Sequence, residues 1–234
     1  MKDSSTRHLF NLVLAAKEMS GNHSYVEGWK KIFNAPSSLE TFRKIGLIHL
    51  LIDSAAQEIL HADSTQIPAV NHWRGQLYSA LATGAQRNWN EFRSLIDDPT
   101  VNYLRMQAAI VELTSPQLSV NSEELERARV LLVDVAEELR QSNLPLAIKI
   151  ALTKRIQLLI CAIDDYAITG NERIFDQFKA TIYDVAASGD SRSEVVTKKF
   201  SDAMEIIANV VSSASGLQQL AAPVMRLLGL GKDP

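Results

Sequence analysis

Apolar residues recur along most of the chain at steps of three and four, which is the spacing of one face of an α-helix. Between these segments, no convincing alternation of apolar and polar residues indicates a half-buried strand. The pattern predicts an all-α fold, a multi-helix bundle of about nine or ten helices with an amphipathic C-terminal helical segment. The expected helices span residues 4–19, 24–33, 38–61, 67–83, 89–97, 99–113, 122–142, 145–168, 172–187 and 192–228.

Polar residues that cap helices mark several of the expected starts. In a capping box, a small polar residue stands three positions before a glutamate, and each side chain accepts a backbone N–H of the other residue. Asp98–Pro99 is a further start signal, because proline fits the first helical position. Gly170 is expected to end the helix over 145–168. The residues with capping-box spacing are Ser37, Asn88, Asn121 and Ser191.

The stretch from Thr114 to Asn121 separates two helical blocks, because Pro116 and its polar neighbours interrupt the periodic pattern. We expect an N-terminal helical bundle over 1–115 and a helical hairpin block over 120–189, followed by an apolar, heptad-spaced segment over 190–234. The two helices of the hairpin need a further partner to cover their apolar faces. A single continuous domain is the alternative.

The C-terminal segment carries a long, regular apolar stripe. Its members keep heptad-type steps of four and three, and no charged residue lies between Glu205 and Arg226. Three alternatives are open for this stripe: packing on the protein's own body, association with a protein partner or a second copy, and contact with a membrane. The positions expected to make the interaction are Val196, Phe200, Ile207, Val210, Leu217, Val224 and Leu228.

Charge and cysteine content narrow the classes of function. The 234 residues carry a net charge of −3, and lysine and arginine form only isolated doublets. A surface that follows nucleic-acid phosphates needs a denser basic face, so nucleic acid is not an expected partner. Cys161 is the only cysteine, which excludes an intrachain disulfide, and the polar N-terminus lacks the apolar core of a signal peptide. We expect a cytoplasmic protein, with membrane association as the alternative.

Candidate chemistry is sparse. Glu58 and His61 form one Glu-x-x-His pair, a unit that di-iron helical bundles use twice. Because a second pair is missing, we expect Glu58 and His61 to be surface or edge residues rather than metal ligands. No other cofactor is expected. Arg43 precedes His49 by six positions, and this pair resembles the Arg-x(4–6)-His element of HEPN ribonucleases. That resemblance implies cleavage of RNA without a metal, with Arg43 and His49 acting on the phosphate.

The run from Leu144 to Gly170, with Asp164-Asp165-Tyr166 near its end, resembles a segment of uncharacterised bacterial all-helical proteins that have a small-residue apolar C-terminal tail. The resemblance covers the second half of the chain. It implies a bacterial regulatory or phage-defence role and assigns no catalytic residue. Our leading hypothesis is a non-enzymatic interaction or regulatory protein that associates through the C-terminal stripe. A membrane-acting effector and a HEPN-like ribonuclease are the alternatives.

Overall fold

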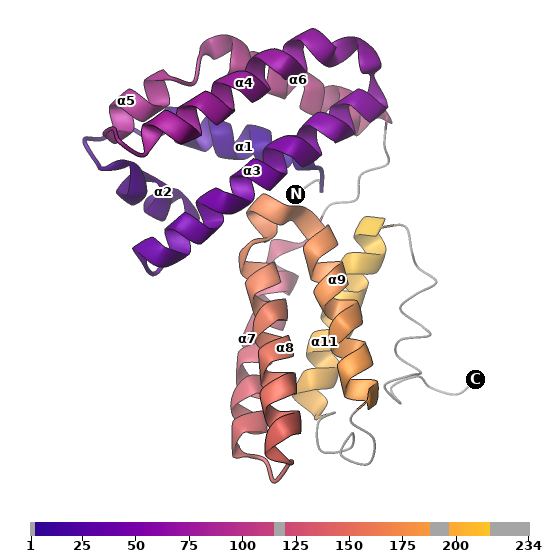
Figure 1. Ribbon diagram of the computed structural model, residues 1–234. Helices are drawn as coiled ribbons and strands as arrows, with labels where there is room; N and C mark the ends of the chain where they lie inside the picture. Colours follow the sequence, from indigo (N-terminus) through magenta and orange to yellow (C-terminus); the bar gives the residue numbers. More distant parts are fainter. Residues whose placement is uncertain (1–2, 115–119, 188–196, 216–234) are drawn as a thin grey trace. The chain divides into compact units, whose positions relative to one another are not determined.

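The computed structural model of the chain describes residues 3–114, 120–187 and 197–215 (Figure 1). Within these ranges the regular elements are helices and no strand is present, which confirms the predicted all-α, multi-helix fold. The helices fall into two compact units. Residues 4–114 form the N-terminal unit, and Asp3 joins the helices of residues 120–215 in the C-terminal unit.

The N-terminal unit is built around α1, which packs against α3 and α6, while α4 covers parts of α3 and α6. The expected caps form at α3 and α5, where the Ser37 and Asn88 side chains accept hydrogen bonds from the backbone N–H groups three residues further on. The helices of this unit are α1 (Ser5–Glu18), α2 (Tyr25–Phe33), α3 (Ser38–Ala62), η1 (Ser64–Gln66), α4 (Ile67–Gly84), α5 (Trp89–Ser94) and α6 (Asp98–Thr114).

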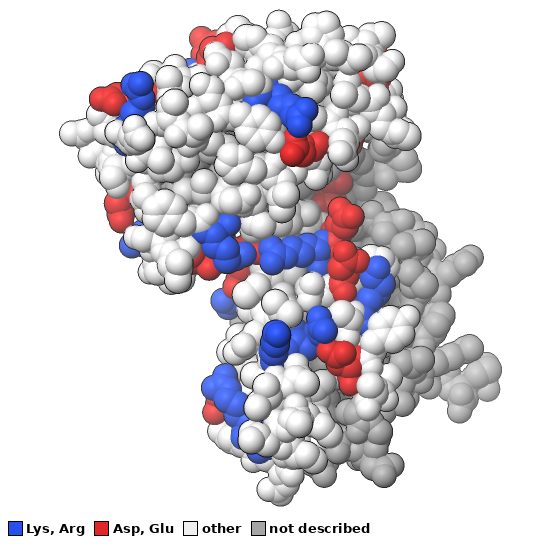
Figure 2. All heavy atoms as spheres, viewed as in Figure 1, with Lys and Arg blue, Asp and Glu red and all other residues white. Residues whose placement is uncertain are grey.

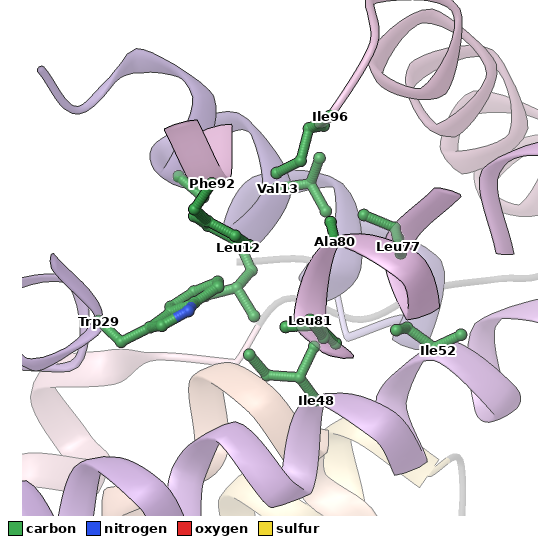
Figure 3. A pocket seen from close by; sticks show the side chains of 11 residues that line it. Leu12, Val13, Trp29, Ile48, Ile52, Leu77, Ala80, Leu81, Phe92 and Ile96 are labelled. Carbon is green, nitrogen blue, oxygen red and sulfur yellow. The ribbon is translucent and has the colours of Figure 1, made fainter. Parts of the chain in front are cut away.

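The core of the N-terminal unit is closely filled. Where its first five α-helices converge, apolar side chains such as Leu12, Ile52 and Leu81 enclose a cavity of only about 10 Å³ (Figure 3). That space holds about one water molecule. Trp73 is fully buried nearby, and its indole N–H donates to the buried Gln107 side chain at 2.8 Å. The interior around this cavity is therefore packing rather than a ligand site.

An aromatic contact joins α2 to α5. The rings of Trp29 and Trp89 meet edge to face, with centroids 5.5 Å apart, and the Trp89 backbone N–H donates to the His23 carbonyl at 2.7 Å. Gly28 makes this approach possible, because a Cβ atom at that position would lie 1.9 Å from the Trp89 ring. A residue of α2 that lacks a side chain is thus required for the packing of α5.

The described residues of the C-terminal unit form a four-helix bundle. Its helices are α7 (Ser122–Gln141), α8 (Leu146–Asp164), α9 (Tyr166–Ala187) and α11 (Lys198–Ser215). α7 packs against α8 and α11, and α9 packs against the same two helices (Figure 1). The Asn121 side chain caps α7 by accepting the Glu123 N–H at 2.9 Å, whereas the predicted cap at Ser191 lies outside the described residues.

The turn between α8 and α9 comes earlier than predicted. The helix over 145–168 was expected to end at Gly170, but α8 ends at Asp164. Gly170 has a φ of 63° and bends α9 after its first turn. The Asp165 side chain at the turn is fully buried, and its carboxylate accepts a hydrogen bond from Arg173 at 2.7 Å. The Asp165–Arg173 ion pair thus holds the turn between α8 and α9. The local sequence pattern does not predict this pair.

Candidate interaction surface

The described part of the C-terminal stripe lies in the protein's own core. Phe200, Ile207 and Val210 are 0%, 0% and 2% exposed, and α11 packs against α7 and α9. These three side chains cover the helical hairpin and are not available to a partner. The expectation that they form an interface is replaced by the simplest of the three alternatives, packing on the protein's own body. Val196, Leu217, Val224 and Leu228 lie outside the described residues.

Glu58 and His61, the Glu-x-x-His pair, have separate surroundings in the structure. One oxygen of the Glu58 carboxylate accepts hydrogen bonds from the Ser4 hydroxyl, the Thr6 backbone N–H and the Thr6 hydroxyl at 2.7–3.0 Å. This carboxylate therefore holds the start of α1, whereas His61 is exposed on α3. In the part of the chain that the structure describes, no group of three or more His, Cys, Asp and Glu side chains could hold a metal ion.

Arg43 and His49, the two residues of the ribonuclease resemblance, have different neighbours. The Arg43 guanidinium donates to the Glu40 carboxylate one turn earlier, with a distance of 2.9 Å from Nε to Oε2, and this hydrogen bond lowers the pKa of Glu40. The His49 ring stacks on Tyr78, with centroids 5.6 Å apart. Cleavage of RNA by this pair stays a prediction.

α3 is apolar on two sides. One side, which includes Ile48 and Ile52, is buried in the core of the N-terminal unit. A second line of residues at steps of three, four and four leaves large apolar side chains in solvent: Leu39 is 81% exposed, Phe42 54% and Leu50 64%. We call this line the α3 stripe, and it spans roughly 16 Å of helix. Its members are Leu39, Phe42, Gly46 and Leu50.

The middle of the α3 stripe is open. A Cβ atom built on Gly46 would meet no atom of the described residues within 4 Å, in contrast to the Cβ position of Gly28. A glycine between large apolar residues allows another backbone to come close, because no side chain holds it away. The α3 stripe therefore combines exposed apolar side chains with a site of close approach.

A polar and aromatic cluster adjoins the stripe beyond Leu50. The Asp53 carboxylate accepts hydrogen bonds from the Tyr78 hydroxyl at 2.7 Å and from the Arg74 guanidinium at 2.6 Å. These two donors, Tyr78 first, lower the pKa of Asp53. The Arg74 guanidinium also lies 5.8 Å from the centre of the Tyr78 ring. Tyrosine and arginine are enriched at the energetic centres of protein interfaces, so the cluster extends a surface of interface character.

Sequence reasoning missed this surface. The residues of the α3 stripe do not follow the register of the buried positions Ile45, Ile48 and Ile52, and that mismatch was the available signal. This mismatch was hard to recognise because α3 has apolar residues on more than one face. The pattern alone does not tell which of these faces is covered.

Comparison with protein families, with curated proteins and with solved structures finds no match for this chain. The geometry of the described residues is therefore the basis for a functional proposal.

None of the helices in the described ranges combines the length and the apolar character needed to cross a membrane. On the face seen in Figure 2, charges of both signs are interspersed among broad uncharged areas.

Proposed function

We propose that the protein is a helical interaction protein that associates with a second copy of itself through the α3 stripe. The observation that carries this proposal is the exposure of Leu39, Phe42 and Leu50 along one line of a helix whose opposite side fills a core. Contiguous exposed apolar patches on soluble proteins mark interaction sites. The proposal keeps the predicted class of function and moves the interface from the C-terminal stripe to α3.

The layout of the stripe supports pairing with an identical helix. In a two-fold symmetric interface, the same patch serves both copies and must be self-complementary. Phe42 and Leu50 lie four residues before and four residues after Gly46. An antiparallel pair of α3 helices with its two-fold axis at Gly46 therefore sets Phe42 of one copy against Leu50 of the other, with the glycines at the closest approach.

Charged groups beside the stripe are compatible with this arrangement. Arg43 is paired with Glu40, and Arg74 is paired with Asp53, within each copy. Burial of the stripe therefore leaves these pairs at a polar rim, which is the usual anatomy of a protein interface. Pairing of two α3 helices therefore does not require a charge of either pair to be buried without its partner.

The expected affinity is moderate. Six large apolar side chains, three from each copy, leave water on pairing, and full burial of one such side chain contributes about 1.5–3 kcal/mol. Partial burial and an association cost of at least about 4 kcal/mol reduce the net gain. We expect a dissociation constant on the order of micromolar to tens of micromolar. The dimeric fraction then depends on the protein concentration, which suits the regulatory role that the bacterial resemblance implies.

The test is the solution mass of the full chain, measured by light scattering from a few micromolar to a few hundred micromolar. We compare the wild type with Phe42→Glu/Leu50→Glu and with a matched control, Met106→Glu/Leu113→Glu, which alters exposed apolar residues of α6. The wild type and the control are expected to reach the dimer mass as concentration rises, while the α3 variant stays monomeric with unchanged helix content. A monomeric wild type, or an α3 variant that dimerises normally, contradicts the proposal.

A further inference from the structure

The C-terminal unit carries a second surface of unusual composition, at the end of the bundle where α7 turns into α8. An open depression of about 450 Å³ lies there, and none of the described residues that line it is acidic. Aliphatic and cationic side chains make up most of the lining. We call these residues the α8 patch: Arg140, Leu146, Lys149, Ile150 and Lys154.

Two aliphatic side chains of the patch stand in solvent. Leu146 is 72% exposed at the first residue of α8, and Ile150, one turn further on, is 61% exposed. By helical geometry, Lys149 and Lys154 project roughly 60–80° to either side of the line through these two residues. The patch is thus an apolar line with a cation on each flank.

The positive charge of the patch is only partly compensated. The Lys149 ammonium donates to a neutral group, the backbone carbonyl of Arg140, at 3.3 Å. Lys154 is exposed and makes none of the ion pairs found in the described residues. Arg140 pairs with Glu137 at 2.8 Å, and both of these side chains remain more than half exposed. Lys154 and the half-buried Lys149 therefore have no carboxylate partner among the described residues.

We propose that the α8 patch binds the surface of a membrane that contains anionic lipids. Leu146 and Ile150 enter the boundary between headgroups and acyl chains, and Lys149 and Lys154 reach headgroup phosphates on either side. Amphipathic helices that lie at lipid interfaces combine an apolar line with flanking cations in this way, and long lysine side chains keep the charge in the headgroup layer. A depression of 450 Å³ is also large enough to receive a headgroup.

The geometry favours a membrane over an acidic protein segment. A protein segment that binds by its apolar face needs a groove that encloses its side chains. Here the two aliphatic side chains are mostly exposed, and the depression that they line is open to solvent. A deformable lipid surface can surround such exposed side chains, whereas a rigid helix cannot. This inference does not depend on dimerisation, because the α8 patch and the α3 stripe belong to different units.

The experiment is co-sedimentation of the full-length protein with vesicles of equal parts phosphatidylserine and phosphatidylcholine, compared with vesicles of phosphatidylcholine alone. Two variants alter the patch: Leu146→Ser/Ile150→Ser removes the apolar line, and Lys149→Glu/Lys154→Glu reverses the flanking charges. The matched control is Lys30→Glu/Lys31→Glu on α2, which changes the net charge equally. Far-ultraviolet circular dichroism checks that all variants remain folded.

The expected result is binding to the anionic vesicles that weakens at least tenfold in both patch variants, persists in the control and is not displaced by inorganic phosphate. Binding to neutral vesicles is expected to be much weaker, because the attraction of the lysines is lost. No binding to anionic vesicles overturns the inference, as does equal loss in the control. Binding of soluble polyglutamate without binding of vesicles also overturns it, in favour of an acidic protein ligand. The patch variants keep the wild-type solution mass, so failure here is distinct from failure of the α3 proposal.

Discussion

α3 and α11 both carry an apolar line at helical spacing, but the line on α11 is buried and the line on α3 is exposed. On α11, Phe200 and Ile207 are completely buried against neighbouring helices of the bundle. On α3, Leu39 and Leu50 remain mostly exposed, although the other side of the same helix fills a core. An apolar line in a sequence therefore predicts that a surface will be covered, but it does not tell which chain covers it.

The difference follows from the number of apolar faces that each helix has. α11 has one apolar face, and a hairpin with an open side needs a partner of this kind, so burial within the bundle satisfies both. α3 offers more apolar surface than its neighbours in the N-terminal unit cover. Surplus apolar surface that stays in contact with water is a cost to the free protein, and a second copy of the chain can remove it.

The largest expected effect comes from placing an aspartate in the apolar line of each helix and comparing the two losses of stability. Ile207→Asp places a carboxylate in the core of the C-terminal unit, and we expect a loss of more than about 4 kcal/mol in the free energy of unfolding. Leu50→Asp should change that free energy by no more than about 0.5 kcal/mol, because the site is exposed. Urea unfolding followed by circular dichroism measures both changes. Equal destabilisation by the two variants would break the comparison.

A second pair of changes tests the open middle of the α3 stripe. Gly28→Ala should destabilise the protein by about 1–3 kcal/mol, because the new Cβ collides with the Trp89 ring. Gly46→Ala should stabilise the monomer by roughly 0.5–1 kcal/mol, because alanine favours the helix and its Cβ lies within 4 Å of no atom in the part of the chain that the structure describes. The measurement is urea unfolding at low protein concentration. A destabilised Gly46→Ala variant would show that the site is already occupied.

The next prediction concerns Asp97, a polar group that orders the unit of α3 without belonging to the stripe. Partial burial acts to raise the pKa of Asp97, but hydrogen bonds from Thr100, Gln76 and His72 outweigh it and lower the pKa from 3.8 to about 2. One of these bonds is donated by the Thr100 backbone N–H, at the start of α6. Asp97→Asn should therefore cost about 1 kcal/mol at neutral pH.

The pH dependence of that cost has a definite sign. Because the pKa of Asp97 is lower in the folded than in the unfolded protein, its ionised carboxylate stabilises the fold above about pH 4, and this contribution is lost as the pH falls to about 2. The difference in unfolding free energy between the wild type and Asp97→Asn should narrow across this range. A difference that stays constant with pH would assign the effect to another cause.

Local features of the fold were predictable from the sequence. The helices and the caps at Ser37 and Asn88 depend on residues only a few positions apart, so their signals are contained in short windows. The end of α8 was predicted too late. The chain turns after Asp164, where the buried carboxylate of Asp165 pairs with Arg173, and this pairing depends on how α9 packs.

Features that depend on distant residues were not predictable in the same way. Glu58 and His61 had the spacing of a ligand pair, but one carboxylate oxygen of Glu58 accepts hydrogen bonds from Ser4 and Thr6, more than fifty positions away. The fate of the apolar lines depends on the packing of whole helices, so neither the burial of Ile207 nor the exposure of Leu50 follows from periodicity.

The most direct test of pairing through α3 is a disulfide across the proposed two-fold axis. Gly46→Cys is made in a Cys161→Ser background, so that position 46 carries the only thiol, and Met106→Cys in the same background is the control. Two α3 helices that cross at position 46 bring the two thiols within bonding reach. We predict that mild oxidation yields a covalent dimer with Gly46→Cys and little with Met106→Cys. Equal yields from both variants, or no covalent dimer from Gly46→Cys at concentrations of several hundred micromolar, would contradict pairing through α3.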